Sequence, residues 1–102
     1  MRMAPTQLNL PSAQLAAFCR RHHIRRLAIF GSALRDDFGP DSDIDVLVEF
    51  EPGHTPGLGF FTVQRALSDL LGRTVDLHTP QFLSPAIREQ VLAAAWDAYV
   101  AA

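Results

Sequence analysis

The chain has 102 residues, of which 48% are hydrophobic, and its formal net charge is −2. This length favours one domain with one modest core, and the composition is globular rather than disordered. This negative net charge gives no electrostatic reason to expect binding to nucleic acid. The chain has no lysine, which excludes a lysine nucleophile and a P-loop lysine. Its nine arginines are available for phosphate contacts.

The N-terminal third predicts one helix and one strand. Residues 1–10 are expected to be a loose lead-in, and Pro11 opens a helix whose apolar residues recur at helical spacing and whose last turn is basic. Residues 25–30 predict a short strand that ends at a Gly-Ser turn. We expect a helical turn over 33–36 and a loop over 38–42 to follow it.

A second strand is predicted over residues 43–50, because polar and apolar residues alternate there. One face of this strand is apolar, whereas Asp43, Asp45 and Glu49 lie on the other. A loop rich in proline and glycine then leads to a helix over 58–71, which the following glycine ends.

The C-terminal third predicts a third strand over 73–79 and a final helix that starts at Ser84 and extends as far as Trp96. The order of elements is therefore helix, strand, strand, helix, strand, helix. It predicts a small α/β or α+β domain whose helices pack on one face of a twisted sheet.

Cysteine usage and hydropathy bear on the compartment. Cys19 is the only cysteine, so no internal disulfide can form, and its apolar neighbours predict a buried side chain. The N-terminus lacks the charged-then-apolar pattern of a secretory signal, and no run of 18 apolar residues is present. We therefore expect a cytoplasmic protein without a membrane partner.

The Gly-Ser turn at Gly31 and Ser32 is typical of a phosphate site. It lies between a strand and a helical turn, where backbone N–H groups point outward and can bind an anion. Gly31 allows close approach of the backbone, and the Ser32 hydroxyl can donate to a phosphate oxygen. Arg35, about one helical turn later, can add a charge-assisted contact.

Three aspartates predict a metal site beside this turn. Asp43 and Asp45 are two residues apart in a predicted strand, so they point to the same face and can converge on one or two Mg²⁺ ions. Asp76 lies in the middle of the third strand. If that strand lies beside the second, Asp76 can join them, either as a third metal ligand or as the base that takes a proton from an attacking hydroxyl.

The histidines receive no role at this point. His22 and His23 are adjacent and point to different faces, which indicates a surface pair at a helix end. His78 shares the strand face of Asp76, but nothing else in the sequence assigns it to a site.

These residues resemble the signature of the DNA polymerase β-like nucleotidyltransferase superfamily, which is Gly-Ser, ten residues, then Asp-x-Asp. The segment LAIFGSALRDDFGPDSDIDVLVEF, the later RTVDLHT and the short length are similar to its minimal nucleotidyltransferase branch over about residues 12–96. The resemblance implies a single minimal nucleotidyltransferase domain over residues 1–102, built as a small mixed sheet flanked by helices.

The resemblance also implies roles for the motif residues. It implies ATP as the substrate and Mg²⁺, with two ions, as the cofactor. One departure is Asp36, where many relatives carry glycine. The residues so assigned are Gly31 and Ser32 for phosphate binding, Asp43 and Asp45 for metal binding, and Asp76 as the third carboxylate.

In toxin-pairing members of this branch, the acceptor is a tyrosine hydroxyl of a HEPN-domain toxin, which the attached AMP silences. The resemblance therefore implies transfer of AMP from ATP to such a toxin, by an antitoxin of a type VII-like pair. The alternative is a non-catalytic antitoxin that neutralises its partner by occlusion, because the chain is too short for a second, acceptor-holding domain. The same brevity disfavours an enzyme that modifies a small molecule, and both homo- and hetero-oligomers stay open.

Overall fold

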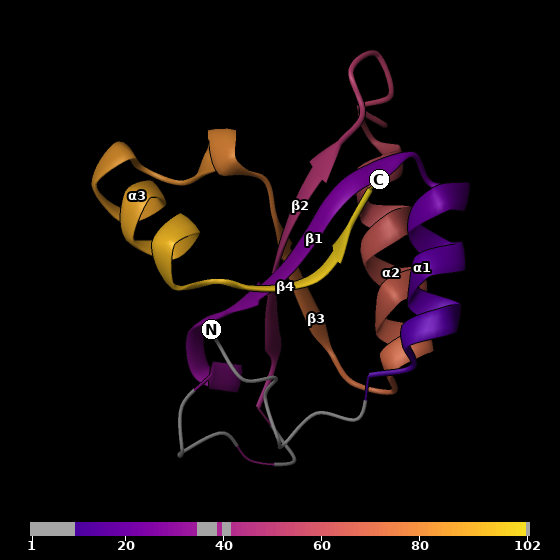
Figure 1. Cartoon of the computed structure of the whole chain (residues 1–102), viewed down its shortest axis with the longest axis horizontal. Helices are drawn as coiled ribbons and strands as arrows, with labels where there is room; N and C mark the ends of the chain where they lie inside the picture. The colour runs from indigo at the N-terminus through magenta and orange to yellow at the C-terminus, as the bar shows by residue number, and fades with distance from the viewer. Residues whose placement is uncertain (1–9, 35–38, 40–41, 102) are drawn as a thin grey trace.

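The fold is built on a mixed four-stranded sheet (Figure 1). The structure is a computed structural model, and it describes residues 10–34, 39 and 42–101. The strands follow the order β3-β2-β1-β4 across the sheet. The central strand β1 is antiparallel to both β2 and β4, whereas β2 and β3 are parallel. The mixed sheet is thereby confirmed, and its strands are β1 (Ile24–Phe30), β2 (Ile44–Phe50), β3 (Val75–His78) and β4 (Trp96–Val100).

Two helices cover one face of the sheet, α1 (Ser12–Arg21) and α2 (Gly59–Leu71), and they lie side by side in Figure 1. The apolar stripe of each helix packs against the alternating apolar residues of β1 and β2. Both helices begin and end close to the residues predicted from the spacing of these apolar side chains. Cys19 is buried in this core as predicted, and burial raises the pKa of its thiol to about 12. Among the described residues, no helix is long and apolar enough to cross a membrane. The main core contains Leu15, Cys19, Ile24, Leu27, Ile29, Ala33, Ile44, Val46, Val48, Val63, Leu67, Val75 and Leu77.

The prediction that all helices pack on one face was wrong. Helix α3 (Pro85–Ala94) packs instead against the opposite face, where Ala28 and Leu47 alternate with the main-core residues of β1 and β2. Val91 and Leu92 of α3 cover these two side chains. All ten residues of α3 are described and none is buried, so the helix is only loosely attached to the sheet.

The end of the predicted last helix was also wrong. Helix α3 ends at Ala94, Ala95 is extended, and the next residues form β4 instead of another helical turn. Strand β1 supplies backbone partners for this segment, and the Arg26 side chain donates a hydrogen bond of 2.7 Å to Asp97. Pairing with a distant strand therefore overrides the local helical preference of the alanines.

Helix α2 fixes the edge strand β3 through two of its side chains. The Val75 N–H donates to Ser68 Oγ at 3.0 Å, and the Leu77 N–H donates to Gln64 Oε1 at 2.9 Å. These acceptors replace the neighbouring strand that an edge lacks. The helix ends at Gly72, whose φ of 68° is left-handed, and the chain then turns directly into β3. The strand that carries Asp76 is thus held firmly beside β2.

Candidate active site

Two aspartates lie opposite each other on the parallel strands β2 and β3. Asp45 is paired with Asp76 in the register of the ladder, so both side chains project from the same face of the sheet. This is the face of Leu47, opposite to α1 and α2. The Asp45 side chain is 29% exposed and that of Asp76 is 58% exposed, so one carboxylate is half-buried and the other faces solvent.

His78 completes this group. Its Nε2 atom lies 3.3 Å from Asp76 Oδ2 and 3.7 Å from Asp45 Oδ1, and its ring meets the edge of Phe30 with centroids 5.4 Å apart. Nε2 is buried and has no hydrogen-bond partner among the residues that the structure describes. Asp45, Asp76 and His78 can each offer one ligand atom, and these atoms lie within 4.8 Å of one another.

Gly31 brings the predicted phosphate turn against this group. It directly follows Phe30, which pairs with Asp45, and its φ of 73° is left-handed. A Cβ atom at Gly31 would overlap Asp45 Oδ2 and would lie 3.2 Å from Asp45 Cγ. Only glycine therefore lets the backbone of the short 3-10 helix Gly31–Leu34 begin beside the carboxylate.

The other predicted site residues are only partly covered by the described residues of the structure. Asp43 is exposed and comes just before β2, close enough to repel the charge of Asp45. The backbone of Ser32 belongs to the 3-10 helix Gly31–Leu34, but its side chain is outside the described part of the chain. Arg35, Asp36 and the second half of the predicted helical turn also lie outside the described residues.

Arg73 holds the chain that leads into Asp43. Its guanidinium donates hydrogen bonds to the carbonyl oxygens of Gly39 and Ser42, the second at 3.2 Å. The Ile44 N–H donates to the Thr74 carbonyl at 2.9 Å, which joins the starts of β2 and β3. The exposed Asp43 is thereby carried on a segment with fixed ends.

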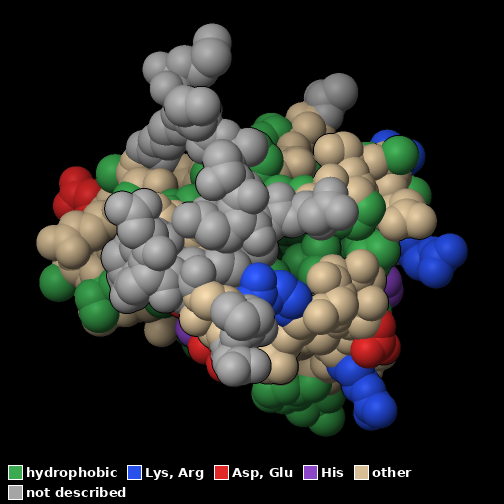
Figure 2. Space-filling model, turned by 90° about the horizontal axis from the view of Figure 1, so that it is seen from below, with side chains coloured by type: hydrophobic (Ala, Val, Ile, Leu, Met, Phe, Trp, Pro, Cys, Tyr) green, Lys and Arg blue, Asp and Glu red, His purple; other side chains and the backbone are tan. Residues whose placement is uncertain are grey.

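The electrostatics of the group favour a bound cation. Burial raises the pKa of the Asp45 carboxyl, and repulsion from Asp76 and Asp43 acts in the same direction, while His78 opposes the shift. A cation would remove this penalty on the ionised form. Carboxylate oxygens are the ligands that Mg²⁺ prefers, so the aspartates fit that ion, whereas the imidazole of His78 is better suited to contacting the carboxylates. Seen from the end of the sheet at which β2 begins, acidic and histidine side chains reach the surface next to each other (Figure 2).

Sequence reasoning gave His78 no role, although its position two residues after Asp76 put both on one strand face. The missing information was the register of β3 against β2, which brings Asp45 to the same imidazole. Arg73 was missed as well, since no local pattern indicates that its side chain reaches back to residues 39 and 42.

Comparison with known proteins gives a consistent result. A family model described as "Nucleotidyltransferase domain" matches residues 12–95. The protein adenylyltransferase MntA of Thermococcus cleftensis is 38% identical over 73 residues, which span 71% of this chain and 72% of that protein. A solved structure of a candidate minimal nucleotidyltransferase is 40% identical, has a TM-score of 0.70, and covers 83% of this chain and 86% of its own. A complex of a tri-AMPylated Shewanella oneidensis HEPN toxin with an MNT antitoxin matches with a TM-score of 0.63 and 18% identity, over 88% of this chain and 70% of that chain, and so shares the fold.

Proposed function

This chain belongs to the nucleotidyltransferase domain family, and from that membership we propose that it transfers AMP from ATP to a hydroxyl group of a partner protein. The observation that carries this proposal is the cluster at the ends of β1, β2 and β3. Asp45 and Asp76 are in register on parallel strands, and the backbone at Gly31 lies directly against the Asp45 carboxylate. This placement supports the proposal, because nucleotidyl transfer needs a phosphate-binding turn next to a divalent-cation site.

Each motif residue has a distinct part in the proposed reaction. Gly31 and Ser32 bind the phosphates through backbone N–H groups and the serine hydroxyl, and Arg35 adds a positive charge. Asp43 and Asp45 hold Mg²⁺, which when bound neutralises the charge of the triphosphate.

The transfer itself forms one bond and breaks one bond. The acceptor oxygen attacks the α-phosphorus, the bond from that phosphorus to the pyrophosphate oxygen breaks, and the hydroxyl proton leaves to a base or to water. Asp76 is more exposed than Asp45. It either completes the metal ligands or takes this proton.

The proposed acceptor is a tyrosine of a HEPN-type toxin. Two findings support this choice: a relative of 38% identity is named a protein adenylyltransferase, and a fold neighbour stands in complex with a HEPN toxin that carries AMP. The exposure of Asp43 and Asp76 is a third support, because it leaves the site open to a macromolecular acceptor. The chain would then act as an antitoxin through catalysis.

Incubation with labelled ATP, Mg²⁺ and a HEPN-type toxin as the acceptor tests the proposal. We expect AMP on a toxin tyrosine, detected by mass spectrometry, and no label with the double variant Asp43→Asn/Asp45→Asn. Glu89→Gln on α3 is a matched control, since it also removes an exposed carboxylate but lies outside the cluster. An unlabelled toxin in the presence of the folded parent chain would contradict the proposal.

Neutralisation by occlusion is the second candidate, and exposed apolar side chains favour it. Leu58, Phe61 and Phe82 are 87%, 64% and 82% exposed. Phe82 also lines a groove of about 430 Å³ together with Phe50 and Phe60, which is suitable for contact with another protein. If Asp43→Asn/Asp45→Asn still neutralises the toxin in cells as well as the parent does, binding alone is sufficient and catalysis is not the mechanism.

A further inference from the structure

A second cluster of possible metal ligands lies at the other end of β2. His23 is in the turn between α1 and β1, whereas Glu51 and His54 lie in the loop that follows β2. His23 Nδ1 is 3.5 Å from Glu51 Oε2, and the rings of His23 and His54 are stacked with centroids 4.0 Å apart and planes 16° from parallel. One ligand atom from each residue lies within 4.8 Å of the other two.

The backbone holds these three residues together. The Glu51 N–H donates to the His23 carbonyl at 2.8 Å, and the His54 N–H donates to the Glu51 carbonyl at 3.0 Å. Segments far apart in the sequence are therefore joined before any ligand binds. The side chains of His23 and Glu51 are 51% and 44% exposed, so they are free to rotate toward a shared ion.

We propose that His23, Glu51 and His54 bind a divalent transition-metal ion of the zinc class. Two imidazole nitrogens and one carboxylate oxygen are a ligand set that Zn²⁺ takes with a water molecule in the fourth position. At metal–ligand distances of about 2.0–2.2 Å, tetrahedral ligands are roughly 3.3–3.6 Å apart. The 3.5 Å between His23 Nδ1 and Glu51 Oε2 already fits this geometry, and the separations to His54 lie within 4.8 Å.

Charge and chemistry agree with this ligand. The cluster carries one carboxylate and two imidazoles, and among the described residues Glu51 has an ion pair only with His23 of the cluster itself, at 3.5 Å. The carboxylate of Glu51 is therefore available to a cation. A zinc-class ion is favoured over Mg²⁺ because two of the three ligands are imidazole nitrogens.

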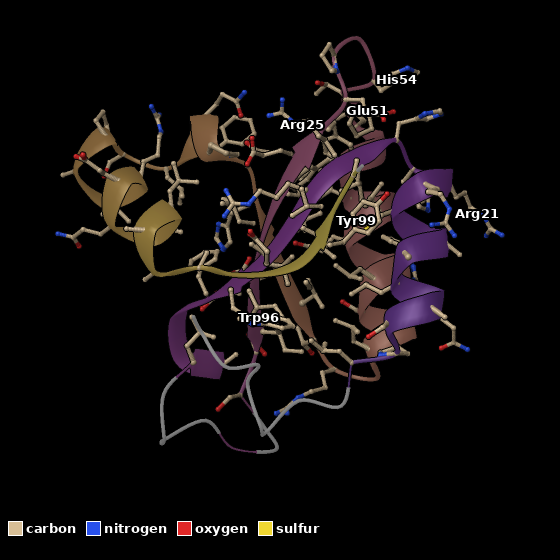
Figure 3. The ribbon with its side chains drawn as sticks, viewed as in Figure 1. Arg21, Arg25, Glu51, His54, Trp96 and Tyr99 are labelled. Carbon is tan, nitrogen blue, oxygen red and sulfur yellow. The ribbon has the colours of Figure 1, made fainter. Side chains whose placement is uncertain are left out.

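This cluster is separate from the nucleotidyltransferase site. Asp45 is near the beginning of β2 and Glu51 follows its end, a separation of about 20 Å along an extended strand. Figure 3 shows Glu51 and His54 at the loop beyond β2, away from the end of the sheet at which that strand begins. The bound ion would fasten this loop to the turn between α1 and β1, whether or not the proposed transfer of AMP is correct.

Isothermal titration with ZnCl₂ tests the proposal. The full chain used for it carries Asp45→Asn and Asp76→Asn, which removes both carboxylates of the Asp45, Asp76 and His78 group. We expect one Zn²⁺ per chain. His54→Ala should weaken binding at least tenfold, because loss of an outer-shell partner alone costs roughly 10–100-fold and loss of a ligand costs no less.

His22→Ala is the matched control, since His22 is the sequence neighbour of His23 but packs on Phe18 with ring centroids 4.5 Å apart. It should leave zinc affinity unchanged. Amide exchange of Glu51 should slow with Zn²⁺ in the parent and not in His54→Ala. Absence of zinc binding, equal affinity in His54→Ala, or an equal loss in His22→Ala would each overturn the proposal.

Discussion

Replacement of Gly31 by alanine should both destabilise the fold and disable the site. The φ of 73° places a Cβ-bearing residue in the left-handed region, at a cost of about 1–2 kcal/mol. The new Cβ would also overlap Asp45 Oδ2, and turning that carboxylate away from its present rotamer costs about 0.5–1.5 kcal/mol more. We expect a total loss of about 2–3 kcal/mol, which lowers Tm by roughly 10–20 °C in a domain of this size.

Gly72→Ala separates the two contributions. Gly72 has nearly the same φ, 68°, but a Cβ there meets no atom within 4 Å among the described residues. This variant should therefore lose only the backbone cost of about 1–2 kcal/mol. Transfer of AMP should persist in Gly72→Ala at temperatures below its Tm and be lost in Gly31→Ala.

Thermal and urea unfolding of the two single variants, with and without Asp45→Ala, give the steric contribution directly. Truncation of Asp45 removes the oxygen that the new Cβ meets, so Gly31→Ala should cost less in that background. Equal losses for Gly31→Ala and Gly72→Ala, or no coupling between Gly31→Ala and Asp45→Ala, would refute the close approach of this turn to Asp45.

Three further outcomes follow from the structure. Without divalent cations at neutral pH, Asp45→Asn should raise Tm, because burial and the neighbouring aspartates raise the pKa of the Asp45 carboxyl in the folded state. This gain in Tm should vanish as the pH falls below the ordinary carboxyl pKa of about 3.9. Thermal melts of the variant and the parent over that pH range measure it. Gln64→Ala leaves the Leu77 N–H without its acceptor and should cost about 1–3 kcal/mol in urea unfolding, whereas the exposed neighbour Arg65→Ala should change stability by less than about 0.5 kcal/mol. Arg73→Gln should lower stability and raise the KM for ATP, because it frees the segment before Asp43; an unchanged KM would separate that segment from nucleotide binding.

Local sequence patterns were sufficient for most elements of this fold. Strand β2 was found because its polar and apolar residues alternate, and α2 because its apolar residues recur at helical spacing and a glycine follows. Strand β4 was missed because the alanines before Trp96 favour a helix, whereas the strand depends on pairing with β1, some 70 residues earlier. Information of that kind is not present in a short window of sequence.

The site, like the fold, was predictable where it depends on local sequence spacing and not where it depends on the pairing of distant strands. The spacing of Asp43 and Asp45 predicted a shared strand face, but Asp43 comes just before β2 and only Asp45 lies in that strand. The predicted position of Asp76 rested on a condition, namely that β3 lies beside β2. The structure meets the condition through the parallel register and through Gln64 and Ser68 of α2, which bind the edge of β3. His78 joined the cluster only once that register was known.

The position of Asp45 also explains why a site of this kind lowers the folding stability of so small a domain. Its carboxylate is half-buried beside Asp76 and behind the backbone at Gly31, and its raised pKa means that the folded chain disfavours the ionised form. That form is nevertheless the one that binds a cation. Binding of a cation therefore offsets the loss of folding stability that the ionised Asp45 causes. Metal occupancy and folding should be linked, and the domain should have its largest free energy of unfolding when cation and nucleotide are both present.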